Sequence, residues 1–306
     1  MSLTNDLNLC YNSRGKIPHT LPCWLCMISP FHRSHKEIPV MTTVTKAKAG
    51  ASLQFAQRLF TRGTDVFGPG EIQTVFGIEI PADKVSPIPF SEGELQTARR
   101  LGEVLTFQVP ELTMAMIHDR RQNKTSDGKP LFYNTKWYRE EPFYTGDNPV
   151  GRWKLLTREV LHGSLGENYL QQTPVLVSHL GEVFGNQMPS YAQAAIDEFE
   201  GSRKAIEKLM DEDWQKAAEQ LANLKMSKFF RPSPVEVLSV ITMYEAINHE
   251  RLLPNVWTWT NKRSSNGGLV SVGYFDGNGV RVARDDPRSR NDFLGACFSR
   301  GGNGEL

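Results

Sequence analysis

The chain has 306 residues, of which 39% are hydrophobic, and it carries 35 Lys and Arg against 34 Asp and Glu, for a formal net charge of +1. This length suits one large domain or two modest ones, with enough apolar residues for a substantial core. The near-zero charge excludes binding to nucleic acid or an anionic membrane through bulk attraction, and no apolar run approaches the roughly 20 residues of a membrane-spanning helix. We therefore expect a soluble protein with no nucleic-acid partner and no membrane span.

Residues 1–40 are rich in Pro, His, Cys and Ser and show no sustained hydrophobic periodicity. We interpret them as a flexible leader before a fold that begins near Met41. The sequence has four cysteines, three of them in the first 26 residues and the fourth at Cys297. Such a sparse and uneven set is not a disulfide scaffold, so we expect a reducing compartment, most simply the cytoplasm.

Cys23 and Cys26, followed by His32 and His35, are ligand types that tetrahedral zinc accepts. Only five residues separate Cys26 from His32, whereas finger-like sites leave about a dozen for a hairpin and a helix. The spacing therefore favours a leader without a metal site, and no metal is predicted.

Residues 41–125 are interpreted as an N-terminal α/β region. The spacing of apolar residues between Gly70 and Ile88 predicts a short strand. Ser91 and Glu94 form a capping box ahead of apolar residues at helical spacing, so a helix is predicted over roughly 92–105. The polar stretch 122–130 predicts an exposed turn and a boundary with a second region over 126–301.

Seven aromatic residues fall within 22 residues after this turn. They are Phe132, Tyr133, Trp137, Tyr138, Phe143, Tyr144 and Trp153. Rings at this density usually lie in a core, and a stacking platform for a sugar or a base is the alternative. Glu140 and Glu141 could perform acid–base chemistry among these rings, although carboxylates in a surface loop are expected to be solvated.

Residues 189–225 show the clearest helical periodicity. Their apolar residues predict one or two amphipathic helices, broken near Asp211 to Asp213, with Trp214 on the buried stripe. Ser233-Pro234-Val235-Glu236 then supplies an N-cap, a proline in the first turn and a capping-box glutamate. Another helix is therefore predicted, which ends before Pro254.

From Trp257 onward the hydrophobic period changes to two, which predicts strands. Asp276-Gly277-Asn278-Gly279 predicts a tight turn between two antiparallel strands. The expected elements are a strand at 257–260, a strand at 269–275, a return strand at 280–283, a polar loop at 284–292, a last strand at 294–299 and a tail at 302–306.

No phosphate-loop, dinucleotide-binding, nucleophile-elbow or zinc-protease pattern occurs in the sequence. Gly68-Pro69-Gly70 and Gly163-Ser164-Leu165-Gly166 are not followed by a Lys-Ser/Thr pair, so both are interpreted as turns. His118-Asp119-Arg120-Arg121 lacks the other elements of a kinase catalytic loop. No cofactor and no catalytic residue is predicted.

The C-terminal third carries a family resemblance in two segments. The first comprises Asp213-Trp214-Gln215-Lys216-Ala217-Ala218 and Arg231-Pro232-Ser233-Pro234-Val235-Glu236-Val237-Leu238. The second comprises Trp257-Thr258-Trp259-Thr260, Val272-Gly273-Tyr274-Phe275-Asp276-Gly277 and Gly295-Ala296-Cys297-Phe298-Ser299-Arg300. Together they cover roughly 90 residues, and they resemble the end of a bacterial C-type-lectin-like domain, the fold shared with formylglycine-generating-enzyme relatives. The chain from about Met41 is also similar to an uncharacterised bacterial protein family.

This resemblance implies an α+β fold whose C-terminal unit ends in an antiparallel β-hairpin, preceded by a mixed helical region. A lone Cys297 cannot supply the paired or copper-binding thiols of the oxidising enzymes, and the Glu-Pro-Asn and Gln-Pro-Asp motifs of calcium lectins are missing, so it favours binding over catalysis. In some family members this segment is diversified by a reverse-transcriptase system. The corresponding ligand-binding candidates are Trp259, Asn261, Arg263, Ser265, Asn266, Tyr274, Arg284, Asp286, Arg288, Arg290 and Asn291.

We therefore predict a non-catalytic protein that recognises a protein or glycan ligand through this C-terminal face, which the resemblance allows to be sequence-diversified. Tyrosine and tryptophan offer contact area at small entropic cost, and arginine and asparagine adapt their hydrogen bonds. Two alternatives stay open. One is an enzyme of unknown class with its site among the aromatics and carboxylates of 133–154, and the other is a structural or phage-derived protein without a small ligand.

Overall fold

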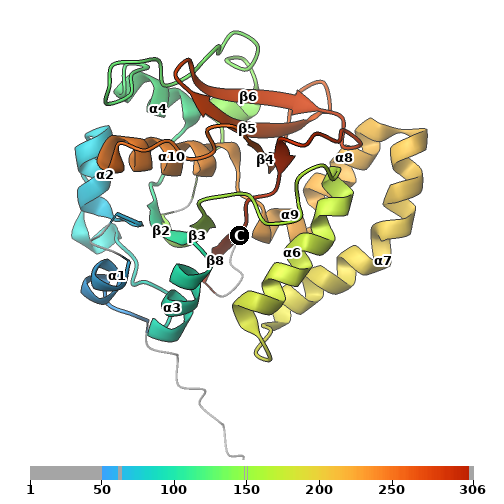
Figure 1. Ribbon diagram of the computed structural model, residues 1–306, viewed down its shortest axis with the longest axis horizontal. Helices are drawn as coiled ribbons and strands as arrows, with labels where there is room; N and C mark the ends of the chain where they lie inside the picture. The colour runs from blue at the N-terminus through green and yellow to red at the C-terminus, as the bar shows by residue number, and fades with distance from the viewer. Residues whose placement is uncertain (1–49, 61–63, 148, 150, 303–306) are drawn as a thin grey trace, which may run out of the picture. The chain divides into compact units, whose positions relative to one another are not determined.

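The computed structural model describes residues 50–60, 64–147, 149 and 151–302, which form an α+β arrangement with two four-stranded sheets (Figure 1). The expected leader at 1–40, its cysteines and histidines, and residues 303–306 lie outside these ranges. The described residues belong to one compact unit. The expected boundary near 125 therefore does not separate two independently folded bodies.

The first sheet joins segments that are far apart in the sequence. Its strands are β1 (Val66–Phe67), β2 (Glu103–Gln108), β3 (Arg152–Thr157) and β8 (Ser299–Gly301), in the order β1-β2-β3-β8. β2 and β3 pair antiparallel over six residues, and β8 pairs antiparallel with β3 through Leu155 and Arg300. The last described strand, β8, therefore forms one edge of the sheet whose other edge is the first strand, β1.

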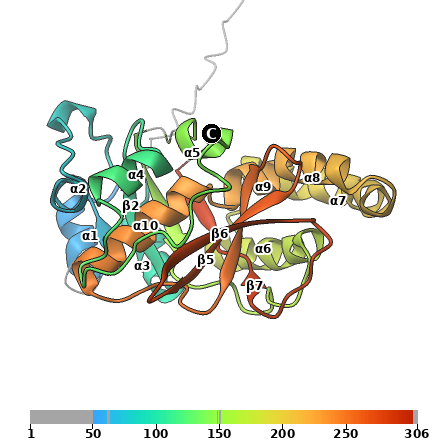
Figure 2. The ribbon, with the colours of Figure 1, turned by 90° about the horizontal axis from the view of Figure 1, so that it is seen from above.

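Short helices and one long helix surround this sheet and supply the first hydrophobic core. They are α1 (Leu53–Leu59), α2 (Pro69–Phe76), α3 (Glu92–Arg100), α4 (Met114–Arg120), α5 (Pro142–Thr145) and α10 (Pro234–Asn248), with a 3-10 turn at Ala82–Lys84. α10 is buried along most of its length, because it packs against α2 and α4 and against β4 and β5 of the second sheet (Figure 2).

The second sheet consists of β4 (Trp257–Arg263), β5 (Leu269–Asp276), β6 (Gly279–Asp285) and β7 (Leu294–Gly295), in the order β6-β5-β4-β7. Val270 and Val272 belong to the first core, whereas Trp259 and Leu269 belong to a second core. The helices of that second core are α6 (Tyr169–Phe184), α7 (Ser190–Glu212), α8 (Trp214–Asn223) and α9 (Lys225–Phe230). The hairpin sheet is therefore anchored by both cores.

Several predicted elements are confirmed. Ser91 and Ser233 each cap a helix through a capping box, as their sequence patterns predict. The helical stretch after 189 breaks at Asp213, which ends α7 and caps α8. The tight turn after Asp276 joins β5 to β6 as an antiparallel hairpin. Most of the aromatic stretch is core, since Phe132, Tyr138, Phe143, Tyr144 and Trp153 are buried.

The prediction of a strand between Gly70 and Ile88 is wrong, and the glycine–proline turn before it is part of a helix start. Pro69 occupies the first turn of α2, and Glu71 accepts a hydrogen bond from the Gly68 backbone N–H at 2.8 Å. A proline and a capping carboxylate at these positions favour a helix, and they outweigh the period-two pattern that follows.

Three further boundaries differ from the predictions. The helix expected to reach 105 ends at Arg100, because Gly102 adopts a positive φ of 71° and the chain then enters β2. The last strand is split into β7 and β8, which lie in different sheets. Trp214 is only half-buried and begins α8, so it is not a central member of a buried stripe.

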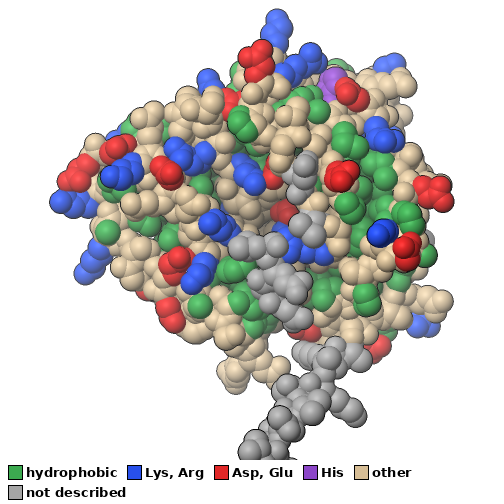
Figure 3. Space-filling view, turned by 180° about the vertical axis from the view of Figure 1, so that it is seen from behind, with side chains coloured by type: hydrophobic (Ala, Val, Ile, Leu, Met, Phe, Trp, Pro, Cys, Tyr) green, Lys and Arg blue, Asp and Glu red, His purple; other side chains and the backbone are tan. Residues whose placement is uncertain are grey.

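None of the helices within the described ranges is both long enough and apolar enough to cross a membrane. On the face shown in Figure 3, basic and acidic side chains are interspersed with apolar ones. This mixture accords with the net charge of +1.

Candidate functional site

The β5–β6 hairpin is irregular at Tyr274, its one partly exposed aromatic residue. The pairing of the two strands shifts between Gly273 and Asp276, and Tyr274 has a positive φ of 49°. A Cβ atom on Gly273 would lie 2.3 Å from the carbonyl oxygen of Val256, so only glycine permits this approach of β5 to β4. The bulge therefore fixes the local backbone that carries Tyr274.

Four partly exposed residues form what we call the aromatic cluster: Tyr133, Trp257, Tyr274 and Arg281. The Arg281 guanidinium lies 4.8 Å from the ring centroids of both Tyr133 and Tyr274. The rings of Tyr274 and Trp257 are 6.0 Å apart. Asp276 binds the Arg281 Nη2 at 2.9 Å, which holds the guanidinium in place. Because the Tyr133 side chain is 56% exposed, this cluster offers ring surface and an oriented cation to solvent.

The position of Tyr133 depends on a tertiary contact. Its backbone N–H donates to the Val280 carbonyl at 3.0 Å, and Phe132 forms an isolated parallel bridge with Val280 of β6. This contact joins the aromatic stretch of the sequence to the C-terminal hairpin. It brings together two regions that sequence reasoning treated as competing sites.

Trp259 must be removed from the predicted ligand-binding set. Its side chain is fully buried in the second core and lies edge-on to Tyr169 at 5.6 Å. Trp257, on the same strand, is partly buried at the edge of this core. The period-two pattern predicted the strand, and the family resemblance placed Trp259 in the binding set, but α8 and α9 contact β4 and cover this position.

Glu141 forms a second meeting point between the two regions. Its carboxylate accepts hydrogen bonds from the Ser265 backbone N–H at 2.7 Å and from the Ser265 hydroxyl at 2.9 Å. Arg284 also donates to it at 3.3 Å, and the guanidinium of Arg284 lies 4.7 Å from the Trp137 ring centroid. The expectation of a solvated Glu141 is wrong, since the residue is buried. These bonds anchor the β4–β5 loop. Because both oxygens of the carboxylate accept hydrogen bonds from the protein, the group is engaged in a structural role.

Three other predicted site residues serve the fold. The Asn261 amide donates to the Arg231 carbonyl at 3.2 Å. Arg263 donates to the carbonyls of Gly267 and Gln215, and the Asn266 side-chain oxygen accepts from the Gly268 N–H at 3.2 Å. The bond of Asn261 ties β4 to the segment after α9, and those of Arg263 and Asn266 shape the loop between β4 and β5, so all three side chains are bonded to backbone groups.

The loop at 284–292 exposes its arginines but also pairs them. Arg288 binds Asp286 at 2.5 Å, and Arg290 donates to the Gln171 side chain at 2.6 Å. Burial raises the pKa of Asp286, but its hydrogen bonds with Arg288 outweigh this effect and the pKa is lowered. Asn291 accepts from the Phe293 N–H at 2.8 Å, which shapes the turn before β7. These hydrogen bonds fix the backbone of the loop, from which the side chains of Arg288 and Arg290 extend into solvent.

The described residues contain no group of three or more His, Cys, Asp or Glu side chains that could hold a metal ion. Cys297 is buried, and burial raises the pKa of its thiol to about 11. At neutral pH this sulfur is a protonated thiol, which is a poor nucleophile. Its backbone N–H donates to the Thr258 hydroxyl at 2.7 Å, which ties the segment after β7 to β4.

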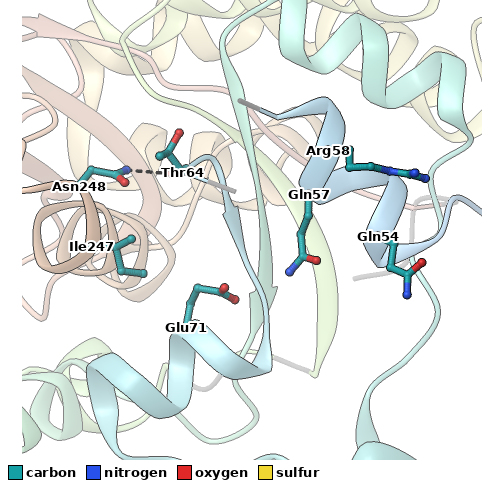
Figure 4. A pocket seen from close by; sticks show the side chains of 7 residues that line it. All are labelled: Gln54, Gln57, Arg58, Thr64, Glu71, Ile247 and Asn248. Atoms are coloured by element: carbon teal, nitrogen blue, oxygen red, sulfur yellow. Dashed lines mark hydrogen bonds between the residues drawn. The ribbon is translucent and has the colours of Figure 1, made fainter. Parts of the chain in front are cut away.

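A pocket of about 620 Å³ lies between α1, α2 and the end of α10 (Figure 4). Its lining residues are Gln54, Gln57, Arg58, Thr64, Glu71, Ile247 and Asn248. The Asn248 amide donates to the Thr64 carbonyl at 2.8 Å, and Glu71 caps α2. Both of these side chains therefore hold backbone groups at the ends of their helices.

No family model matches the chain, and neither a curated protein nor a solved structure matches it. Of the predicted set, Tyr274 alone belongs to the aromatic cluster. Sequence reasoning missed Trp257, Arg281 and Tyr133. Strand alternation with Val280 and Val282 could have identified Arg281 as outward-facing, whereas the position of Tyr133 depends on the fold.

Proposed function

We propose that this protein is a non-catalytic recognition protein that binds a protein or glycan ligand through its C-terminal sheet, centred on the aromatic cluster. The observation that carries the proposal is the placement of Arg281 between the rings of Tyr133 and Tyr274, with the partly exposed Trp257 next to Tyr274. Tyrosine, tryptophan and arginine are the residue types that contribute most to binding energy at interfaces.

The rigidity of the scaffold supports this proposal. Gly273, the Asp276–Arg281 ion pair and the bridge at Val280 all fix the backbone or side chains of the cluster. Side chains that are already ordered lose little conformational entropy when a ligand binds. An enzyme centred on 133–154 gains no comparable support, because the Glu141 carboxylate is occupied by Ser265 and Arg284.

We also propose that the C-terminal region is C-type-lectin-like and that its exposed loop positions can be sequence-diversified. This proposal is supported by the positions of the sequence motifs in the second segment that resembles the family, each of which contributes to a strand or turn of the C-terminal region. The aromatic-Thr motif lies in β4, the Asp-Gly motif turns β5 into β6, and Arg300 lies in the closing strand β8. Arg288 and Arg290 are exposed positions at which substitutions would leave the core intact. A cytoplasmic location, expected from the sparse cysteines, belongs to the same proposal.

The test uses a displayed peptide library and a glycan array, screened with the parent protein. Ligands selected in this way should lose at least about tenfold in affinity for the Tyr133→Ala/Arg281→Ala variant, since hot-spot side chains are worth more than about 1.4 kcal/mol each. Affinity should be measured by biolayer interferometry, with circular dichroism to show that the variant is folded.

The matched control is Lys208→Ala/Glu212→Ala, which removes an exposed ion pair on α7. Binding to this control should equal binding to the parent. If the selected ligands bind the cluster variant as tightly as the parent, or lose affinity for both variants equally, the aromatic cluster is not the recognition site.

A further inference from the structure

A pocket of about 530 Å³ lies between the segment that follows β3 and the segment that precedes β4. Its volume falls within the range of roughly 300–1,000 Å³ that is typical of ligand pockets. Most of the lining is apolar, and the apolar lining residues are Val160, Leu161, Leu165, Leu253, Pro254 and Val256. Since Val256 directly precedes Trp257 in the chain, the pocket adjoins the aromatic cluster.

The bulged strand β5 holds one wall of this pocket as well as the cluster. The Tyr274 backbone N–H donates to the Val256 carbonyl at 2.8 Å, and the Phe275 N–H donates to the Leu253 carbonyl at 3.0 Å. Leu253 has a positive φ of 53°, which is uncommon for leucine and persists only where the surroundings hold the backbone. The same stretch of β5 therefore positions Tyr274 and the wall beside it.

The opposite wall is held by the segment that contains β7. The Leu161 N–H donates to the Ala296 carbonyl at 2.8 Å, and the Ala296 N–H donates to the Ser164 hydroxyl at 3.0 Å. A Cβ atom on Gly295 would lie 2.8 Å from the Cβ of Val160, so only glycine permits this close approach. Both walls are thus fixed by the second sheet, and the pocket is formed in the absence of a ligand.

Exposed apolar side chains gather around the pocket and the cluster. Within the described ranges, the large hydrophobic side chains that are exposed are Tyr133, Leu165 and Phe293. Tyr133 belongs to the cluster, and Leu165 lines the pocket. The Phe293 carbonyl accepts from the Trp257 N–H at 2.6 Å, so Phe293 lies beside the strand that adjoins both. Such a grouping favours an interaction surface over isolated surface residues.

The chemistry of the lining indicates which kind of ligand can use it. The hydroxyl groups of a glycan would lose hydrogen bonds to water against apolar walls. An aliphatic or aromatic side chain has no such cost, and its burial is favourable. Glu159 and His162 also line the pocket at exposed positions, where they can bond to the polar main chain of a peptide.

We propose that the partner recognised by the C-terminal sheet is a protein, and that it inserts one large apolar side chain into this pocket. This inference rests on the proposed function and specifies the class of the ligand. A buried anchor side chain next to exposed tyrosine, tryptophan and arginine is a common arrangement of energetically dominant contacts at protein interfaces.

A displayed library of random linear peptides should be selected on the full chain, and the tightest-binding peptide synthesised as the probe. The probe should contain a Leu, Ile, Met, Phe or Trp whose replacement by alanine weakens binding at least about tenfold, as expected when a large buried side chain is truncated. Biolayer interferometry measures the affinity. This arm needs no variant of the protein, so it is independent of any effect on folding.

Leu165→Asp places a charge in the pocket wall at an exposed position and should weaken binding of the same probe at least about tenfold. On this variant, replacing the apolar anchor of the probe by alanine should cost less than about threefold more, because the two changes remove one contact. Ala194→Asp adds the same charge at an exposed position of α7 and should bind the probe as the parent does. Circular dichroism shows that both variants are folded.

Two outcomes separate this inference from the proposed function. If Tyr133→Ala/Arg281→Ala weakens binding of the probe and Leu165→Asp does not, the pocket is not used, while the aromatic cluster remains the recognition site. If Leu165→Asp weakens binding and the cluster variant does not, the pocket is a ligand site and the cluster is not. A probe without an apolar anchor, or a protein that binds glycans and selects no peptide, would overturn the proposal of a protein partner.

Discussion

Replacing Glu103 with alanine is expected to lower the free energy of unfolding by about 3–5 kcal/mol, because it leaves the buried Arg300 guanidinium without its counter-ion. The two side chains are 0% and 2% exposed, so water cannot replace the lost carboxylate. Burial opposes ionisation of Glu103, but Arg300 and His179 outweigh this effect and lower its pKa. The carboxylate is therefore ionised at neutral pH. Its stabilising contribution is complete above the ordinary pKa of a glutamate and is lost as the pH falls from there through the lowered folded-state pKa.

Urea denaturation followed by tryptophan fluorescence measures this change. The double variant Glu103→Ala/Arg300→Met should recover at least half of the lost stability, because it removes the unpaired charge as well. Lys208→Ala breaks an exposed ion pair on α7 and should leave the midpoint unchanged. A loss below about 1 kcal/mol for Glu103→Ala would contradict the assignment, since exposed ion pairs contribute about that much or less.

Replacing Trp259 with alanine should have an effect of similar size, about 3–5 kcal/mol, because it opens a large cavity in the second core. The side chain is fully buried and contacts Tyr169. Trp257→Ala is the matched control on the same strand, and since that residue is only partly buried at the edge of the second core we expect a smaller loss of about 1–2 kcal/mol.

Trp259→Phe separates packing from hydrogen bonding. The indole Nε1 of Trp259 is buried and has no hydrogen-bond partner within the described residues, so phenylalanine loses volume but no hydrogen bond. We expect it to retain more than half of the stability that alanine loses. Thermal denaturation of the three variants tests this order. Equal melting temperatures for Trp259→Ala and Trp257→Ala would show that Trp259 is accessible after all.

Local patterns predicted the elements whose signals are contained within a few residues. The capping boxes at Ser91 and Ser233 define helix starts, because each cap satisfies backbone N–H groups of its own helix. The Asp276 turn likewise defines a hairpin from four consecutive residues. Such elements can be predicted without knowledge of their neighbours.

Elements that depend on distant partners could not be predicted in this way. Leu105 was assigned to a helix, yet it lies in β2, where it pairs with Leu155 of β3. The ion pair between Glu103 and Arg300 joins residues 197 positions apart, and no local pattern signals it. Pairing across such separations is set by the topology of the whole sheet.

The candidate site was predicted in part for the same reason. Tyr274 was predicted through the family resemblance, whereas its companion Tyr133 lies next to it through the bridge between Phe132 and Val280. Trp259 was predicted through the same resemblance, yet packing of α8 and α9 buries it. Sequence periodicity identifies which residues share a face, and the tertiary structure decides which part of that face is covered.

Hydrogen–deuterium exchange tests the central claim most directly, using a peptide or glycan selected on the parent protein. Bound ligand should slow amide exchange in the peptides that span 131–134, 256–258 and 272–282, because these segments carry the aromatic cluster. The exposed outer turns of α7 should exchange at the same rate with and without ligand. Slowed exchange confined to α7 and α8, with no change at 272–282, would contradict recognition through the C-terminal sheet.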